Sequence, residues 1–305
     1  MSNVRKHLVF TTSRIDDDAK FIHFGCGGTA ISISITHKIS DFASLVTFLG
    51  SWSSSCRVLN GSGGDQILPD LNLIGQIVPG PIPTSSTPTS SKFPPPGTKE
   101  YIAKRVFFSA SKIEELRTKV ISGLRKSEQD DQYCRPSRID VVIALIWKCS
   151  LAAANRFSMD QSQEFRPSIM MYSVNIRSRI HPPLSETSIG NLACQFQMVV
   201  EKESEMELHE LVKQLAAKKA DADKVGKRRY QGDDLKAVVE WGKPVWVTNA
   251  SNTSKALVNT IVLMETKEEG GVEVLVNLWE EEMRVFECNE ELLQFASINP
   301  NPNVV

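Results

Sequence analysis

Alternating apolar and polar residues mark the first clear strand of the chain. Over 30–36, isoleucine at every second position alternates with serine or threonine, the pattern of a half-buried strand. The period then changes, because the apolar residues from Phe42 to Leu49 recur at helical spacing. The change falls on residues 37–41, so a strand is expected to pass directly into a helix there.

The rest of the chain mixes strands and helices without regular alternation. The patterns predict helices at 111–124, 137–156, 204–215 and 287–296, and strands at 102–108, 169–176, 245–248, 257–264 and 272–278. Such an order is typical of an α/β fold with mixed sheets rather than of repeated βαβ units.

A stretch rich in proline, serine and threonine divides the chain. Residues 79–98 hold seven of the 15 prolines, and such a stretch forms neither a helix nor a central strand. We therefore expect an N-terminal domain over 1–78, an extended crossover over 79–99 and a C-terminal domain over 100–305.

Composition and charge narrow the function classes. The chain has 305 residues, of which 41% are hydrophobic and 23% charged, as in a folded globular protein. A formal net charge of −1 gives no overall positive field for nucleic acid. No apolar signal core opens the chain, and the longest apolar run is too short to span a bilayer. The six scattered cysteines lack metal-type spacing. We expect a cytoplasmic monomer with free thiols, no metal, and no membrane or nucleic-acid partner.

His37 and Asp41 stand where the strand passes into the helix. Histidine is the side chain best suited to general-base work near neutral pH. On the residues alone, three interpretations stay open: a loop histidine beside an N-capping aspartate, a catalytic histidine, or a pair of metal ligands. A metal needs a further ligand, and neither HExxH nor a third nearby histidine supplies one. The chain has no GxSxG, P-loop or GxGxxG motif.

Five segments resemble, in the same order, parts of the plant BAHD acyltransferases. They are 25–52 (GCGGTAISISITHKISDFASLVTFLGSW), around the family's HxxxD motif; 138–149 (RIDVVIALIWKC), the helix after the crossover; 175–191 (NIRSRIHPPLSETSIGN), the NxRxR…PPL…GN segment; 241–247 (WGKPVWV), the end of the DFGWG motif; and 283–300 (MRVFECNEELLQFASINP), the C-terminal helix. Together they extend over nearly the whole chain. The branch they resemble is that of the alkaloid-acetylating enzymes similar to vinorine synthase.

The resemblance implies two chloramphenicol-acetyltransferase-like domains, the first of them incomplete. It also implies transfer of an acyl group from a coenzyme A thioester to a hydroxyl or an amine, with His37 as general base in a channel at the domain interface. No cofactor would be bound permanently; an acyl-CoA, with acetyl-CoA the first choice, would be the co-substrate. The acceptor would be a small plant metabolite such as an alkaloid. The competing interpretation is a non-catalytic remnant of the family.

The resemblance also implies supporting roles for several residues. Asp41 would pair with an arginine, Arg177 or Arg179, and hold the histidine loop without taking part in proton transfer. Three further residues would support the site structurally: Asn191, Trp241 and Gly242. Weaker candidates for binding the 3′-phosphate of coenzyme A are Arg135, Arg138 and Lys243.

Two features depart from the family pattern. Family members carry several strands and helices before the HxxxD histidine, which here lies at position 37, so we expect an N-terminally shortened product. The DFGWG motif reads VVEWG over 238–242, and we interpret the lost aspartate as the mark of a local deletion. Cys26, just before the strand that leads to His37, is expected to be a buried structural thiol.

Overall fold

The computed structural model describes residues 6–13, 18–37, 39–61, 63–71, 101–127, 135–156, 165, 167–178, 183–223, 246–249, 259–266 and 269–300. Contacts divide the chain into two compact units. The first is Met1–Lys99, Asn175–Cys194 and Gly226–Lys255, and the second is Glu100–Val174, Gln195–Val225 and Ala256–Val305. The predicted crossover over 79–99 lies outside the described residues, so the division into domains 1–78 and 100–305 stays a prediction. Residues 175–194 nevertheless pack in the first unit, through the polar contacts described below.

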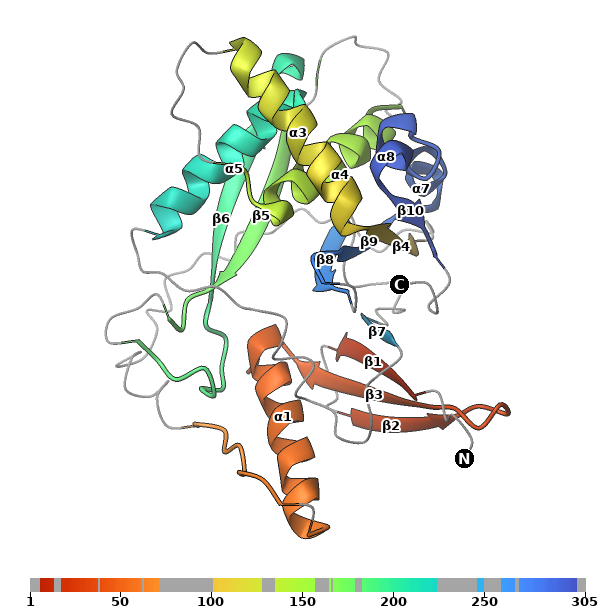
Figure 1. Cartoon of the computed structure of the whole chain (residues 1–305), viewed down its shortest axis with the longest axis vertical. Helices are drawn as coiled ribbons and strands as arrows, with labels where there is room; N and C mark the ends of the chain where they lie inside the picture. The colour runs from red at the N-terminus through yellow and green to blue at the C-terminus, as the bar shows by residue number, and fades with distance from the viewer. Residues whose placement is uncertain are drawn as a thin grey trace, which may run out of the picture. The chain divides into compact units, whose positions relative to one another are not determined.

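The first unit is a four-stranded sheet with a helix packed on it (Figure 1). Its strands are β1 (Lys6–Ser13), β2 (Asp18–His23), β3 (Thr29–Thr36) and β7 (Trp246–Asn249), in the order β2-β3-β1-β7. β1 runs parallel to β3 and β7, and β2 runs antiparallel to β3. Helix α1 (Phe42–Leu59) follows β3, and its Leu45 and Leu49 pack against Ile33. The predicted change from strand to helix is confirmed.

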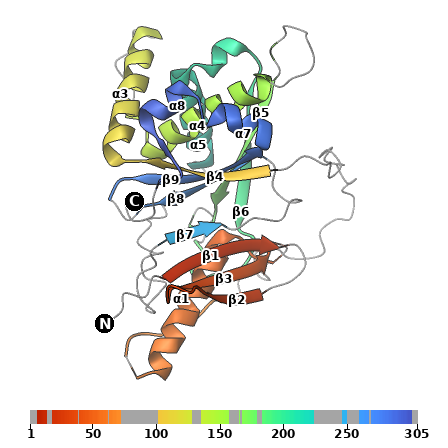
Figure 2. The same cartoon turned by 90° about the vertical axis from the view of Figure 1, so that its right-hand side faces the viewer.

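The second unit packs its helices over an antiparallel sheet (Figure 2). The sheet contains β4 (Tyr101–Phe108), β8 (Thr260–Glu265), β9 (Val272–Trp279) and β10 (Ser297–Ile298), in the order β10-β4-β9-β8. β5 (Ser168–Asn175) and β6 (Ala193–Val200) form a separate pair. The helices are α3 (Ala110–Ser127), α4 (Arg138–Arg156), α5 (Leu208–Asp223), α7 (Glu280–Phe286) and α8 (Glu290–Phe295), with a 3-10 turn at Glu203–Met206. Every residue from Val141 to Trp147 of α4 is buried in the core.

Four details differ from the expectations. β1, β2, β6, β10 and α7 were not predicted, and the helix expected over 287–296 is shorter, extending from Glu290 to Phe295 as α8. This helix begins later than expected because Asn289 is its N-cap residue, whose side chain accepts the N–H of Leu292 at 3.0 Å. Phe42 is 50% exposed instead of facing the core. Cys26 is exposed in the turn between β2 and β3, so the prediction of a buried thiol was wrong.

Neither a membrane-spanning helix nor a metal-binding cluster occurs among the described residues. None of the described helices is both long enough and apolar enough to cross a membrane. No group of three or more histidine, cysteine, aspartate or glutamate side chains in these parts of the chain could hold a metal ion.

Arg105 on β4 joins three segments of the second unit, through a buried ion pair and through its backbone. The Arg105 guanidinium on β4 donates through Nη2 to Glu273 Oε2 on β9 at 2.8 Å, and through Nε to the other carboxylate oxygen. Both residues are buried. The backbone of Arg105 exchanges two hydrogen bonds with Asn299, at 2.8 and 2.9 Å, just after β10. The arginine therefore holds three chain segments together.

We predict that Glu273→Gln destabilises the protein strongly, because it leaves the buried guanidinium without its counter-charge. The free energy of unfolding in urea should fall by about 3–5 kcal/mol. The double variant Arg105→Met/Glu273→Leu, which removes both charges, should recover much of the loss. Glu115→Gln is the matched control, because Glu115 pairs with Lys112 on the exposed face of α3, and it should change little. Equal stability of Glu273→Gln and Glu115→Gln would contradict the prediction.

Candidate functional site

The connection from β3 to α1 carries His37 and Asp41. β3 ends at Thr36 and α1 begins at Phe42, with Asp41 as the N-cap residue. Asp41 has the extended backbone of an N-cap, and its Oδ1 accepts the N–H of Ser44 at 2.9 Å. This bond satisfies one of the backbone donors that the first turn of a helix leaves free. His37 is exposed, whereas Asp41 is only 7% exposed.

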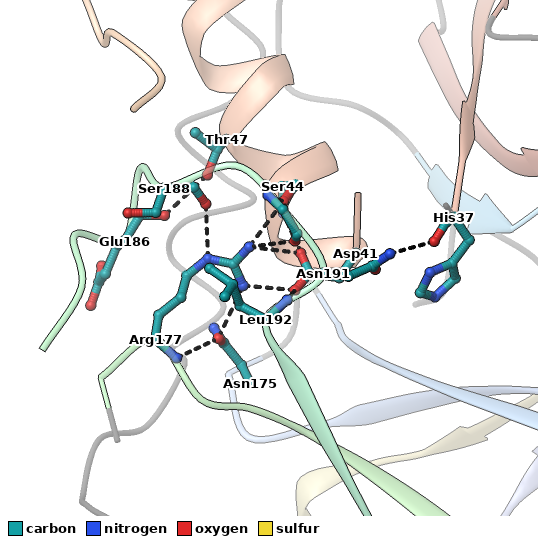
Figure 3. A network of polar contacts seen from close by, with 11 residues as sticks. His37, Asp41, Ser44, Thr47, Asn175, Arg177, Glu186, Ser188, Asn191 and Leu192 are labelled. Carbon is teal, nitrogen blue, oxygen red and sulfur yellow. Dashed lines mark hydrogen bonds and ion pairs between the residues drawn. The ribbon is translucent and has the colours of Figure 1, made fainter. Parts of the chain in front are cut away.

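Arg177 is the buried partner of Asp41 (Figure 3). Its guanidinium binds the carboxylate in a bidentate manner, with Nη1 2.8 Å from Oδ2 and Nη2 2.9 Å from Oδ1. Nε donates to the carbonyl of Ser188 at 2.9 Å, and Nη1 also donates to Asn175 Oδ1 at 3.1 Å. Arg177 is 1% exposed, yet each of its three nitrogens has an acceptor.

Ser44 and Gly190 complete the buried cluster. The Ser44 hydroxyl accepts from the Gly190 N–H at 2.8 Å and from Arg177 Nη2 at 2.9 Å. Its single proton has two acceptors in reach, Asp41 Oδ1 and the Gly190 carbonyl, both at 2.9 Å. Gly190 has φ 150°, a backbone conformation that favours glycine. A residue with a side chain would strain the chain at the point where it meets the cluster.

The segment 183–192 is fastened to the rest of the first unit at several points. The N–H of Leu192 donates to Asp41 Oδ2 at 3.0 Å, and the N–H of Ile176 donates to the carbonyl of Leu192 at 2.9 Å. Ser188 forms a parallel β-bridge with Asp70. The segment therefore presents its backbone to the start of α1 in one fixed register.

Electrostatics keep Asp41 ionised. Burial by itself raises the pKa of Asp41, because it disfavours the charged form. The hydrogen bond from Arg177, the N–H of Ser44, the positive charge of Arg177 and the N–H of Leu192 oppose that effect. Together they outweigh burial and hold the pKa of this carboxyl below its ordinary value of 3.8.

The backbone carbonyl of His37 is hydrogen-bonded to the segment 183–192, next to this cluster. The Asn191 side chain donates from Nδ2 to the carbonyl oxygen of His37. In Figure 3 the His37 imidazole lies apart from the Asp41–Arg177 pair. Among the described contacts no hydrogen bond joins the imidazole to the Asp41 carboxylate, whose partners are Arg177 and the groups around it. Asp41 thus faces inward while His37 is left exposed, where its ring nitrogens can exchange a proton with a bound molecule.

The structure brings together some of the predicted site residues. His37, Asp41, Arg177 and Asn191 meet in the first unit, and Arg177, which also binds Asn175, is the arginine that binds Asp41. Four predicted residues lie outside the described residues: Arg179, Trp241, Gly242 and Lys243.

The two remaining arginine candidates belong to the second unit. Arg135 is exposed and donates to Glu114, and Arg138 is the first residue of α4. Their role in binding coenzyme A stays a prediction.

Sequence reasoning missed Ser44, which is fully buried and touches Asp41, Arg177 and Gly190. A signal was available, because Ser44 follows the N-cap residue by three positions and so lies where the cap makes its hydrogen bonds. Nothing in the local pattern, however, indicates that its hydroxyl also binds a segment far along the chain.

We predict that Asp41→Asn lowers the free energy of unfolding by about 3–5 kcal/mol at neutral pH, because Arg177 then stays buried without a counter-charge. The pKa of Asp41 is lower in the folded than in the unfolded chain, so the ion pair stabilises the fold fully above the ordinary carboxyl pKa. That stabilisation is lost as the pH falls through the folded pKa, below about 4. Urea unfolding should therefore show a gap between wild type and variant at pH 7 that narrows in acid.

Glu280→Gln is the control, because Glu280 pairs with Arg284 on an exposed surface. It should unfold much like the wild type at neutral pH. An Asp41→Asn gap that is absent at pH 7, or that stays constant down to strongly acidic pH, would contradict the predicted role of the pair.

Comparison with known proteins places the chain in a family. Residues 19–240 and 237–293 match the model of the Transferase family. BAHD acyltransferase BIA1 of Arabidopsis thaliana is 30% identical over 321 residues, which cover 92% of this chain and 69% of that protein. Stemmadenine O-acetyltransferase of Catharanthus roseus is 29% identical, over 85% of this chain and 61% of that protein. Vinorine synthase of Rauvolfia serpentina is 28% identical, over 87% of this chain and 62% of that protein.

Solved structures show the same fold. The crystal structure of vinorine synthase matches with a TM-score of 0.65 at 24% identity, over 92% of this chain and 65% of that one. TRI101 of F. sporotrichioides, complexed with coenzyme A and T-2, matches with a TM-score of 0.54 at 13% identity, over 97% of this chain and 82% of that one. The predicted mixed α/β fold is confirmed. Since the family match extends over most of the chain and the Arabidopsis relative is similar over nearly all of it, the protein belongs to the Transferase family, as one of the BAHD acyltransferases.

Proposed function

We propose that the protein transfers an acyl group from an acyl-CoA to a hydroxyl of a small molecule, with His37 as the general base. Acetyl-CoA is the proposed donor and an alkaloid-type alcohol the proposed acceptor, with an amine as the less common acceptor. The protein would act as a cytoplasmic monomer. The observation that carries the proposal is the division of roles in one short loop: an exposed His37 beside a buried, ion-paired Asp41.

The chemistry needs a base of this kind. An alcohol is a weak nucleophile until a base takes its proton as the oxygen attacks the thioester carbonyl. The attack gives a tetrahedral oxyanion, which collapses and expels coenzyme A as a thiolate. The protonated imidazole can then return its proton to the leaving thiolate. Both steps need an imidazole that can take up a proton and release it again, and His37 is exposed.

The activities for which the relatives are named support the reaction class. They include an O-acetyltransferase and BAHD acyltransferase BIA1, and a structural neighbour was solved with coenzyme A. For the phosphates of coenzyme A, the proposal keeps Arg135 and Arg138 as candidate ligands, since arginine binds phosphate in a bidentate manner. Asp41 and Arg177 are proposed to hold the histidine loop and to stay out of the proton transfer.

The test is turnover with acetyl-CoA and a panel of alkaloid and terpenoid alcohols, with release of the free thiol as the readout and mass spectrometry of the product. We expect turnover in the wild type and a loss of about 10²–10⁴-fold in His37→Ala, the usual contribution of a general base. His23→Ala is the matched control, because His23 is an exposed histidine of the same unit whose ring bonds Thr29 Oγ1 at 3.1 Å. This control should retain wild-type activity.

Two outcomes would count against the proposal. Equal turnover in His37→Ala and wild type would remove His37 from the chemistry. Binding of acetyl-CoA without turnover of any acceptor would favour the alternative, a family member that binds ligand and does not catalyse.

A further inference from the structure

The passage from β3 into α1 exposes two apolar side chains and buries two polar ones. Ile39 is 59% exposed and Phe42 is 50% exposed, whereas Ser40 and Asp41 between them are only 2% and 7% exposed. A single exposed apolar side chain is common, but here two lie on one short stretch from which polar side chains are withdrawn, the reverse of an ordinary surface. The same stretch also exposes His37.

Inward contacts of Asp41 explain this arrangement (Figure 3). Its carboxylate binds Arg177, and its backbone N–H donates to the carbonyl of Gly190 at 3.3 Å. Successive residues of a helix point about 100° apart, since one turn takes 3.6 residues. Phe42 therefore cannot follow Asp41 into the buried cluster, and its ring is left half exposed.

The position of Phe42 at the start of α1 directs its side chain toward the histidine loop. Side chains of an α-helix tilt toward its N-terminus, so each covers the turn before its own Cα. Phe42 is the first residue of α1, and the residues before it are those of the histidine loop. Ile39 lies two positions after His37, so their Cα atoms are at most about 7 Å apart.

This loop also stands where a sheet of this kind binds ligands. β1 and β3 run parallel and end together, with Ser13 paired to Thr36. In α/β sheets, ligands bind beyond the carboxyl ends of parallel strands. His37 follows the last residue of β3 directly, and the two exposed apolar side chains follow His37.

We propose that Ile39 and Phe42 determine acceptor specificity, by binding a flat aromatic body whose hydroxyl is then held close to His37. The inference deepens the proposed function and rests on it for its kinetic readout. A phenylalanine ring and an aliphatic side chain offer dispersion contacts and ring stacking but no hydrogen bond. They favour an aromatic alcohol over a small aliphatic or sugar-like one.

Such a contact has a kinetic signature that differs from that of a base. It is made away from the reacting atoms, and so equally in the bound substrate and in the transition state. Its loss raises KM for the acceptor and leaves kcat nearly constant. Loss of the base His37 lowers kcat instead, so the two roles can be told apart.

The experiment uses two primary alcohols that differ in their apolar body: tryptophol, which carries an indole ring, and 1-butanol. Phe42→Ala and Ile39→Ala remove the contacts, and Phe42→Leu keeps an apolar side chain without the ring. Phe48→Ala is the matched control. Phe48 is 44% exposed on the same helix, more than one turn further from His37, and its ring centroid lies 6.2 Å from that of Trp52.

With acetyl-CoA as donor, KM for tryptophol should rise by about 10- to 100-fold in Phe42→Ala, and by less in Phe42→Leu and Ile39→Ala. The preference for tryptophol over 1-butanol, as a ratio of kcat/KM, should fall by a similar factor. Phe48→Ala should match the wild type with both alcohols. Melting temperatures should stay close to wild type, because surface substitutions cost little stability.

A second measurement needs no turnover. In the absence of acetyl-CoA, saturation-transfer NMR gives the dissociation constant of tryptophol. That constant should rise by about 10-fold or more in Phe42→Ala and stay at the wild-type value in Phe48→Ala.

The outcomes separate this inference from the proposed function. If tryptophol binds in the expected order and no protein turns it over, the binding role of Ile39 and Phe42 stands and the proposed function fails. If tryptophol is bound and turned over no better than 1-butanol, or if Phe42→Ala equals Phe48→Ala, the inference is overturned even when the wild type is active. A fall in kcat that tracks a fall in melting temperature, with unchanged tryptophol binding, assigns Phe42 to the fold alone and also overturns it.

Discussion

The candidate site depends on one buried ion pair, that between Asp41 and Arg177. Burying two charges is costly unless each is paired and its remaining hydrogen-bonding groups are satisfied. Here both carboxylate oxygens and each guanidinium nitrogen have partners, which come from α1, from Asn175 and from the segment 183–192. The pair can therefore exist only when these segments are correctly placed, and its presence fixes them relative to one another.

The ion pair and the histidine differ in exposure although one short loop carries both Asp41 and His37. Asp41 is turned inward to the arginine, and His37 is left exposed with no hydrogen bond to the carboxylate among the described contacts. The arrangement differs from a Ser-His-Asp triad, in which the aspartate binds the ring of the histidine and stabilises its charged form. In this protein the Asp41 carboxylate instead accepts the backbone N–H groups of Ser44, in the first turn of α1, and of Leu192. Leu192 follows Asn191, whose side chain donates to the carbonyl oxygen of His37.

The local part of this design could be read from the sequence. The change of hydrophobic period located the end of β3 and the start of α1, and the same residues suggested a capping aspartate beside a reactive histidine. The resemblance to a known family narrowed the partner of Asp41 to Arg177 or Arg179. It could not choose between them, because they lie only two positions apart in the same segment. The roles of Ser44 and Gly190 depend on contacts with residues more than a hundred positions away, which no local pattern encodes. Phe42 fits the helical period of its neighbours yet is half exposed, since the sequence period does not tell how wide the buried face of α1 is.

The spacing of the ion pair along the chain also sets the order in which the site can form. Asp41 and Arg177 are 136 residues apart, and closing a flexible loop of that length costs about 4 kcal/mol of chain entropy. Helix α1 and its cap need only neighbouring residues, whereas contacts between distant residues are slow to form. A chain that has folded only locally would already carry the helix and the histidine without the geometry that joins them. We therefore expect the histidine loop to reach its final shape late in folding, once distant parts of the first unit have come together.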